Sequence, residues 1–331
     1  MSLIHSANAK TPAIVVGLGT LLGSSVVWTK MLTAYLTTLQ LVSTRLVLAS
    51  LTMFALLAVR GELRKPRWTL LRGAMLLGLF DSLLPYLLMA FGASRIDAGL
   101  GTVLIATMPL FTTVFAALPA REERLSVAKL AALVIGLLGV AIIATPKHLG
   151  VGGKLQIGHA AFLAASVALG ASTVYGRRLL ENAPALELSA WKLAGAAVLV
   201  APVMLATDGI PDVLGLGVKP LLAMLFVGIV STGFARTAYL WASGVIGSTK
   251  VSLVTYVMPC VGLIMAWLVL GERPATSTLA GLVLIFVSIA GVLDRRYSKN
   301  ATLRHSMLAR TLRSGKLVSQ NAVCGVRQAT E

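Results

Sequence analysis

The sequence is poor in charged residues, and acidic side chains are especially scarce. Its 331 residues include 12 Asp and Glu, and all charged types together make up 12% of the chain, about half the share of a typical soluble domain. Because 57% of the residues are hydrophobic, an ordinary water-soluble fold is excluded: it would expose large apolar surfaces to water. We therefore expect a protein whose solvent is the lipid bilayer.

Reactive and metal-binding side chains are also rare. The two cysteines, Cys260 and Cys324, are far apart in the sequence, and the four histidines are dispersed. We therefore predict no disulfide, no metal site and no cofactor. No Walker A sequence is present, so ATP-driven activity would need a separate subunit. These absences disfavour an enzyme, including an intramembrane one.

What the sequence contains instead is long apolar runs. Ten of them are long enough to cross the hydrocarbon core as helices of about 20 residues, and they lack the alternating pattern of barrel strands. The runs cover residues 12–29, 33–59, 69–92, 98–118, 127–145, 156–176, 186–206, 219–242, 246–270 and 276–293. This pattern predicts an all-α integral membrane protein with ten transmembrane helices.

The basic residues lie mainly on one side of the predicted membrane. If residues 1–11 are cytoplasmic, the loops on that side hold twelve Lys and Arg before residue 294, whereas the opposite loops hold six. The positive-inside rule then places both termini in the cytoplasm. The net charge of +17 therefore reflects membrane orientation, and we predict no nucleic-acid partner.

The tail, residues 294–331, carries eight further Lys and Arg and no apolar period. Its composition predicts a disordered cytoplasmic segment. Attachment to anionic lipid is the alternative, because basic residues near a membrane surface are attracted to acidic headgroups.

Two halves of the chain repeat. Residues 39–46 align without gaps on residues 186–193, a shift of 147, with Gln40 matching Glu187 and Arg45 matching Lys192. Met-Pro followed 13 residues later by Glu occurs at Pro109 and again at Pro259, a shift of 150. Charged and proline matches are informative because these residues are rare in the chain.

The repeat predicts two five-helix units, residues 12–145 and 156–293. An odd number of helices in each unit makes the second unit enter the membrane from the opposite side. Such inverted-topology repeats are typical of secondary transporters, whose site between the units opens to each face in turn.

With these features the chain, over about residues 12–293, resembles the drug/metabolite transporter superfamily, in particular its ten-helix branch with two EamA-type domains. The first and sixth predicted helices end in aromatic residues, Trp28 and Tyr175, and the second and seventh contain the basic residues Arg45 and Lys192. The fourth and ninth are closed by the Pro…Glu blocks Pro109…Glu122-Glu123 and Pro259…Glu272-Arg273. The resemblance implies a central cavity between the halves, transport of a small metabolite or drug, usually export, and a bacterial inner membrane. Asp81 and Arg236 depart from the apolar pattern expected of the third and eighth helices, which weighs against a generic hydrophobic drug.

Ionisable residues inside the membrane are candidates for function, because burying them in hydrocarbon is costly. Four lie deep in predicted helices: Arg45, Asp81, Lys192 and Arg236. Three cations against one acid favour a substrate with a carboxylate or phosphate. For Arg45 and Lys192, a structural role at backbone carbonyls or helix ends is the alternative to substrate contact or gating.

Asp81 and Arg236 lie near the middle of equivalent helices, where Arg236 takes the place of Tyr86. Since a buried carboxylate changes its proton affinity when a cation approaches or leaves, our hypothesis is that Asp81 couples transport to protons. Arg236 would be its partner or the substrate anchor. A permanent buried ion pair is the alternative.

Aromatic and proline residues complete the predicted site. Tyr86, Tyr239 and Tyr256 are candidates to line the cavity. Pro85, Pro109 and Pro259 are predicted to interrupt their helices, because proline removes a backbone donor, and to bend them during gating.

A multidrug or amine exporter of the same fold is the main functional alternative, followed by a channel or an intramembrane enzyme. The sequence leaves the oligomeric state open.

Overall fold

The computed structural model describes residues 2–117, 131, 134–136, 138–139, 141–142, 154–181, 183–212, 215–246, 251 and 254–293. These residues form helices and their connections, with no strand among them. In chain order the elements are α1 (Ser2–Leu32), α2 (Thr38–Val59), α3 (Trp68–Gly78), η1 (Leu79–Leu83), α4 (Leu84–Ala93), α5 (Ala98–Ile105), α6 (Met108–Ala117), α8 (Lys154–Leu179), α9 (Ala185–Thr207), α10 (Val218–Leu225), η2 (Phe226–Ala235), α11 (Arg236–Ile246), α13 (Val254–Met265), η3 (Ala266–Leu270) and α14 (Thr276–Leu293). The three η elements are π-helical: η1 and η2 lie inside longer helices, and η3 forms the C-terminal end of the helix that begins with α13.

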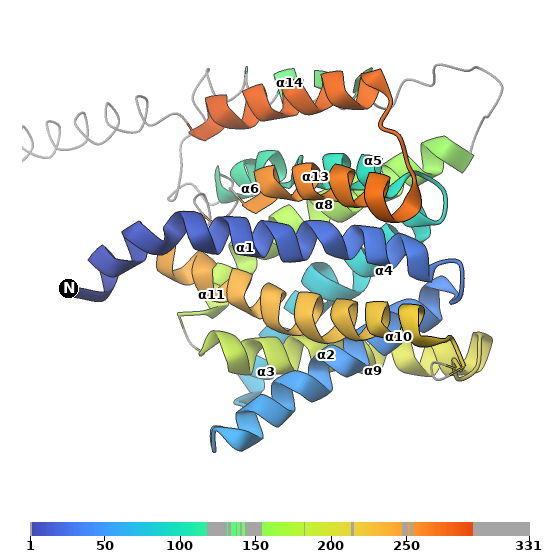
Figure 1. The fold of residues 1–331 in the computed structure, drawn as a ribbon. Coiled ribbons are helices and arrows are strands. Elements are labelled where there is room, and N and C mark those ends of the chain that lie inside the picture. The colour runs from blue at the N-terminus through green and yellow to red at the C-terminus, as the bar shows by residue number, and fades with distance from the viewer. Residues whose placement is uncertain are drawn as a thin grey trace, which may run out of the picture.

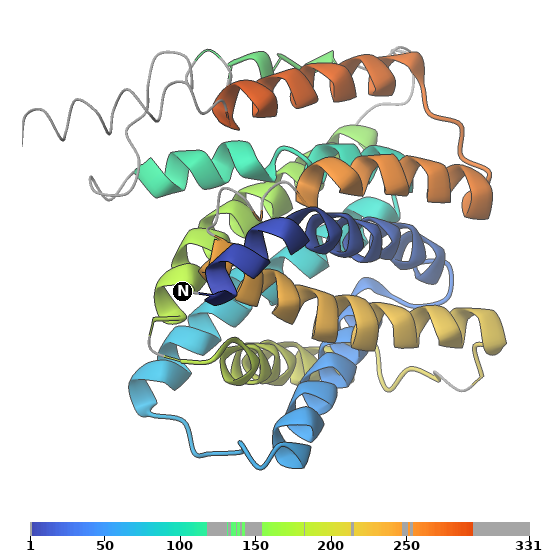
Figure 2. The ribbon, with the colours of Figure 1, turned by 60° about the vertical axis from the view of Figure 1, so that its left-hand side comes forward.

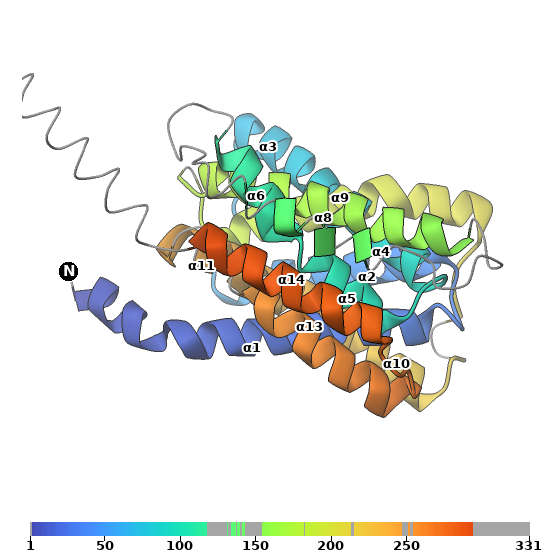
Figure 3. The ribbon, with the colours of Figure 1, turned by 90° about the horizontal axis from the view of Figure 1, so that it is seen from above.

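The described helices account for nine of the ten predicted segments. Seven are long and apolar enough to cross a membrane, and two shorter apolar helices, Val254–Leu270 and Thr276–Ser288, follow them. The predicted segment 127–145 and the tail 294–331 lie mainly outside the described residues. The N-terminal end of α1 and the C-terminal end of α14 lie at the same end of the bundle (Figures 1 and 3), as an even number of crossings requires.

Large apolar side chains are exposed on the outer surface of several helices. Leu51, Val198 and Val283 are about 60% exposed on three different helices, whereas a continuous apolar core runs through both halves of the chain. A surface of this kind is suited to hydrocarbon, and the protein is an all-α integral membrane protein.

The start of α2 corrects a helix boundary expected from hydropathy. The predicted run began at residue 33, but residues 33–37 form a turn and the helix begins at Thr38. The Thr37 hydroxyl accepts a hydrogen bond from the Gln40 backbone N–H, and the Gln40 side chain accepts one from the Thr37 N–H. This capping box satisfies free donors of the first turn, so local polar chemistry sets the boundary inside an apolar run.

The packing of the helices reproduces the repeat. α1 packs on α13, and its repeat equivalent α8 packs on α6; α2 packs on η2, and its equivalent α9 packs on α3. α2 and α9, which are equivalent to each other, also pack together, and this pair is unchanged when the two copies are exchanged. The two copies are thus interleaved by a pseudo-two-fold relation, with α14 at one edge beyond α6 and α13 (Figure 2).

Glycines at repeat-equivalent positions allow the closest of these contacts. A Cβ on Gly78 would clash with the Lys192 carbonyl, and a Cβ on its equivalent Gly228 would approach Leu48 to 2.9 Å, beside the Arg45 carbonyl. Because small residues let membrane helices approach closely, these glycines bring the backbones that carry Lys192 and Arg45 against the third and eighth helices.

Candidate functional site

Six of the seven predicted site side chains meet at the centre of the bundle. They are Arg45, Asp81, Tyr86, Lys192, Arg236 and Tyr239, none more than 6% exposed. Tyr256 does not join them: it is partly buried on α13, with its ring 5.4 Å from the Phe286 ring of α14.

Asp81 is the centre of a buried ion cluster. Arg236 donates to both carboxylate oxygens, through Nη2 to Oδ1 and through Nε to Oδ2 at 3.3 Å, while Lys192 Nζ donates to Oδ2. The hydroxyl of Ser172 lies 3.0 Å from Oδ1. Paired donation from a guanidinium is among the strongest arrangements available to a carboxylate, so Asp81 links three helices of the second copy to the first.

The backbone that carries Asp81 is irregular. Asp81 lies in η1, and the equivalent helix of the second copy contains η2 around the equivalent residue Ser231. π-Turns inside α-helices are frequent at functional sites, because they re-aim the side chains that they carry. Both copies therefore use the same backbone irregularity at the site, although only the first places an acid on it.

Arg45 is held by a different set of groups. Its Nε donates to the Thr232 hydroxyl, its Nη1 lies 3.4 Å from the Thr29 hydroxyl, and its guanidinium lies 3.9 Å from the centre of the Tyr86 ring. Within the described residues, Arg45 has no carboxylate partner.

The two cation environments correspond through the repeat. Arg45 is equivalent to Lys192, and Thr232 and Ser231 occupy in the second copy the places that Ser82 and Asp81 occupy in the first. Lys192 therefore faces an acid where Arg45 faces a hydroxyl. In the described part of the chain, this centre holds three buried cations against one buried acid.

The structure shows which of the predicted residues pair. Arg236 lies on Asp81, the partner hypothesised from the sequence, and Lys192 is bonded to the same carboxylate. For Lys192 the sequence had left substrate contact, gating and a structural role open. Thr29, Ser172 and Thr232 were not predicted, because hydroxyl residues are common in the apolar runs and nothing in their spacing marks them.

The prolines behave differently from one another. Pro109 is the second residue of α6, just after the break between α5 and α6, and Pro85 is the second residue of α4, just after η1. At Pro259 the helix is not broken, because α13 continues through that residue, and its bending during gating stays a prediction. Membrane helices tolerate an internal proline where neighbouring groups satisfy the freed carbonyl.

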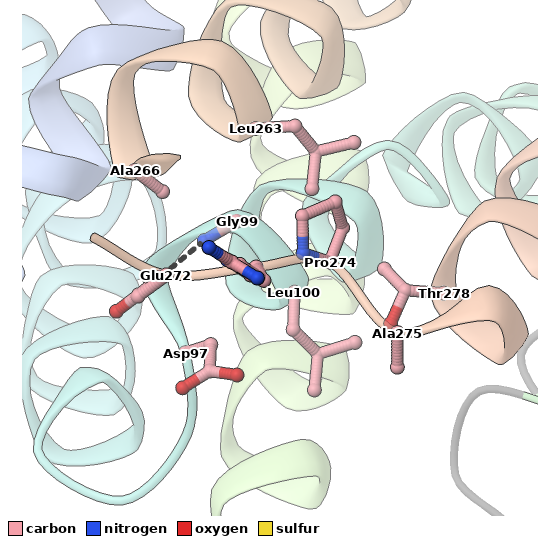
Figure 4. Close-up of a pocket in the computed structure, with 10 residues that line it drawn as sticks. Asp97, Gly99, Leu100, Leu263, Ala266, Glu272, Pro274, Ala275 and Thr278 are labelled. Atoms are coloured by element: carbon pink, nitrogen blue, oxygen red, sulfur yellow. Dashed lines mark hydrogen bonds between the residues drawn. The ribbon is translucent and has the colours of Figure 1, made fainter. Parts of the chain in front are cut away.

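Glu272, the acid of the second Pro…Glu block, lies at the edge of the bundle. It follows Gly271, whose φ of 72° ends η3, and its carboxylate accepts a hydrogen bond from the Gly99 N–H of α5 at 3.3 Å (Figure 4). The hollow beside it has a volume of about 20 Å³, room for one water molecule. This hollow is therefore too small to be the substrate site.

Burial raises the pKa of Glu272, an effect only partly offset by the N–H groups of Ala98 and Gly99. A raised carboxyl pKa means that the folded protein holds the proton more tightly than the unfolded chain, so the free energy of unfolding rises as pH falls through that range. We expect wild type to gain stability relative to Glu272→Gln as the pH falls from neutral towards the ordinary glutamate pKa of 4.5, by less than about 1 kcal/mol at this partly exposed position. Thermal unfolding in detergent measures the difference, and a relative loss at low pH would contradict the assignment.

An all-α membrane protein built from two interleaved repeats, with a charged centre between them, has the architecture of a membrane transporter. The sequence model of the EamA-like transporter family matches residues 11–145 and 156–294, and the chain belongs to this family. It is therefore not an enzyme.

Individual relatives agree with this assignment. The chain is 24% identical to the uncharacterized transporter YoaV of Bacillus subtilis, with 74% of this chain and 83% of YoaV covered. It is 29% identical to a probable terminal-alkyne amino-acid exporter of Streptantibioticus cattleyicolor, with 75% and 80% covered. A crystal structure of a protein with 20% identity shares the fold at a TM-score of 0.63, with 84% of this chain and 95% of that chain covered.

Proposed function

We propose that this protein moves a small carboxylate-bearing metabolite across the membrane by alternating access between its two repeats, residues 12–145 and 156–293. The observation that carries the proposal is the charge of the centre: Arg45, Lys192 and Arg236 are buried with Asp81 as their one acid among the described residues. An uncompensated buried cation is costly, and an anionic substrate removes that cost while it is bound.

The charge balance also distinguishes the candidate substrates. A lipophilic amine would add positive charge beside Arg45, whose neighbours are hydroxyls and an aromatic ring. A carboxylate would instead receive charge-assisted hydrogen bonds from a guanidinium, whose forked donors match its two oxygens. The geometry therefore supports an amino-acid-like or organic-anion substrate over the amine alternative.

The direction of transport and the orientation of the protein in the membrane are parts of the same proposal. We propose export, which is supported by the name of the Streptantibioticus cattleyicolor relative. The excess of basic residues in alternate loops supports cytoplasmic termini in a bacterial inner membrane.

Proton coupling through Asp81 is the remaining part of the proposal. In the described arrangement, Asp81 is paired as a carboxylate with two cations. It would take up a proton in a conformation in which Lys192 and Arg236 have turned to the substrate. Transport driven by an imposed pH gradient tests the idea, and full pH-driven transport by Asp81→Asn would exclude it.

Counterflow in proteoliposomes tests the transported class. The panel pairs organic anions and amino acids with their methyl esters, and adds amines and lipophilic cations. We expect saturable exchange of carboxylates and at least about 10-fold weaker exchange of the matched esters, since losing a charged partner in a buried site costs about 2–5 kcal/mol. Exchange of amines alone would show that the transported class is amines and not carboxylates. Flux that does not saturate would indicate a channel.

A further inference from the structure

The central site holds more positive charge than one carboxylate neutralises. We propose that the substrate is a small dianion, a dicarboxylate or a phosphate monoester, held at two subsites that the two repeats provide. The inference rests on the proposed function and narrows it from anions in general to doubly charged ones.

The first subsite is built around Arg45. Its guanidinium is 2% exposed and is held by two hydroxyls and the Tyr86 ring, none of which carries a negative charge. Ser231, the residue before Thr232, is fully buried, and its hydroxyl has no hydrogen-bond partner in the described structure. Ser231 occupies in the second copy the sequence position of Asp81 in the first, one residue before the Arg45 partner Thr232, so its hydroxyl is an available donor for an acidic group there.

The second subsite is the ion cluster of the other copy. Lys192 and Arg236 share the single carboxylate of Asp81, which leaves one positive charge in excess. Lys192 Nζ has further protons to donate, because an ammonium carries three. A second acidic group therefore has both charge and donors to bind here.

The two subsites are neighbours. Tyr86, over which Arg45 lies, follows Asp81 by five residues on the same continuous helix. Five residues are a little over one helical turn, about 7 Å along the axis, which is comparable to the span of a small dicarboxylate. The helices that carry Arg45 and Lys192, α2 and α9, also pack directly on each other.

The net charge of the closed site distinguishes a substrate with one acidic group from a substrate with two. A monoanion at either subsite leaves the other cation uncompensated when the site closes, whereas a dianion neutralises both. Because uncompensated buried charge is strongly unfavourable, the closed form of the transporter should select dianions.

Competition experiments with matched pairs test this selection. Proteoliposomes loaded with succinate would exchange labelled succinate against external succinate, monomethyl succinate and butyrate at pH 7.5. A second arm would compete methyl phosphate, which is largely dianionic at this pH because its second pKa is about 6, against the monoanion dimethyl phosphate. We expect the dianion of at least one pair to compete at 10-fold or more lower concentration than its monoanionic partner, and the arm that responds identifies the acidic group.

Variants test the two-subsite arrangement. Arg45→Gln should reduce the preference of succinate over monomethyl succinate to below about 3-fold, while Arg45→Lys, which keeps the charge, should retain it. Asp208→Asn is the control, since it removes a carboxylate at the end of α9 that bonds to Thr37 and lies outside the cluster. The thermal stabilisation of each purified variant by succinate and by monomethyl succinate measures the same preference independently of transport.

The outcomes separate the two proposals. Equal competition by monoanions and dianions in both arms would overturn the dianion inference and leave carboxylate transport standing. An unchanged preference in Arg45→Gln would overturn the two-subsite arrangement. Exchange of amines, with no response to any anion in either assay, would remove both proposals.

Discussion

Asp81→Ala is expected to destabilise the protein by about 3–5 kcal/mol, because it leaves two buried cations without their carboxylate. Asp81 accepts hydrogen bonds from two nitrogens of Arg236 and from the ammonium of Lys192, and its removal also ends the contact with the Ser172 hydroxyl. Unfolding in mixed detergent micelles, followed by circular dichroism against denaturant concentration, measures the loss.

Two further variants make this prediction specific. Lys192→Met should cost clearly less than Asp81→Ala, because Arg236 continues to pair with Asp81 through two hydrogen bonds. Arg45→Gln should change the free energy of unfolding by less than about 1 kcal/mol, or raise it. The substitution removes a buried charge that has no carboxylate partner among the described residues, and with it the desolvation cost of that charge. Equal losses for all three variants would show that the cluster is not organised around Asp81.

Gly78→Val is expected to separate α3 from α9 and to destabilise the protein by about 1–3 kcal/mol or more, as overpacking of a close contact does. A Cβ at this position meets the backbone carbonyl of Lys192, which cannot rotate away as a flexible side chain can. The added methyl groups would also move Lys192 away from Asp81, so transport should fall together with stability.

Gly17→Val is the matched control for this prediction. Gly17 is also a helical glycine, but a Cβ there has nothing within 4 Å, so the substitution changes propensity without steric conflict. We expect Gly17→Val to retain wild-type unfolding and transport. Similar losses in both variants would indicate a general intolerance of valine and would contradict the close-contact explanation.

The members of the buried ion cluster could be predicted from the sequence, and so could the pairing of Asp81 with Arg236, but not the sharing of Asp81 by two cations. An ionisable side chain in an apolar run stands out, because the bilayer makes such a residue costly unless it has a role. Arg45, Asp81, Lys192 and Arg236 were identified in this way. Tyr256 shows the limit of the same reasoning: an aromatic residue in an apolar run carries no comparable cost, and this one packs on Phe286.

Only the tertiary structure shows that two cations share the carboxylate of Asp81. Lys192 and Arg236 lie 111 and 155 residues from Asp81, and which cation reaches the carboxylate depends on the rotation and tilt of helices from both copies. Hydropathy is insensitive to both quantities. The π-turn at Asp81 was also invisible to hydropathy, since it leaves the length and composition of the apolar run unchanged.

The sequence by itself determined the solvent of this protein, its helical class and its internal repeat, because the bilayer imposes long apolar runs and the repeat retains rare residues at fixed spacing. Only the tertiary structure decided that Lys192 and Arg236 share Asp81 while Arg45 faces hydroxyls and a ring. Apolar patterning fixes which segments enter the membrane, whereas the contacts of buried charges depend on how the helices pack against one another.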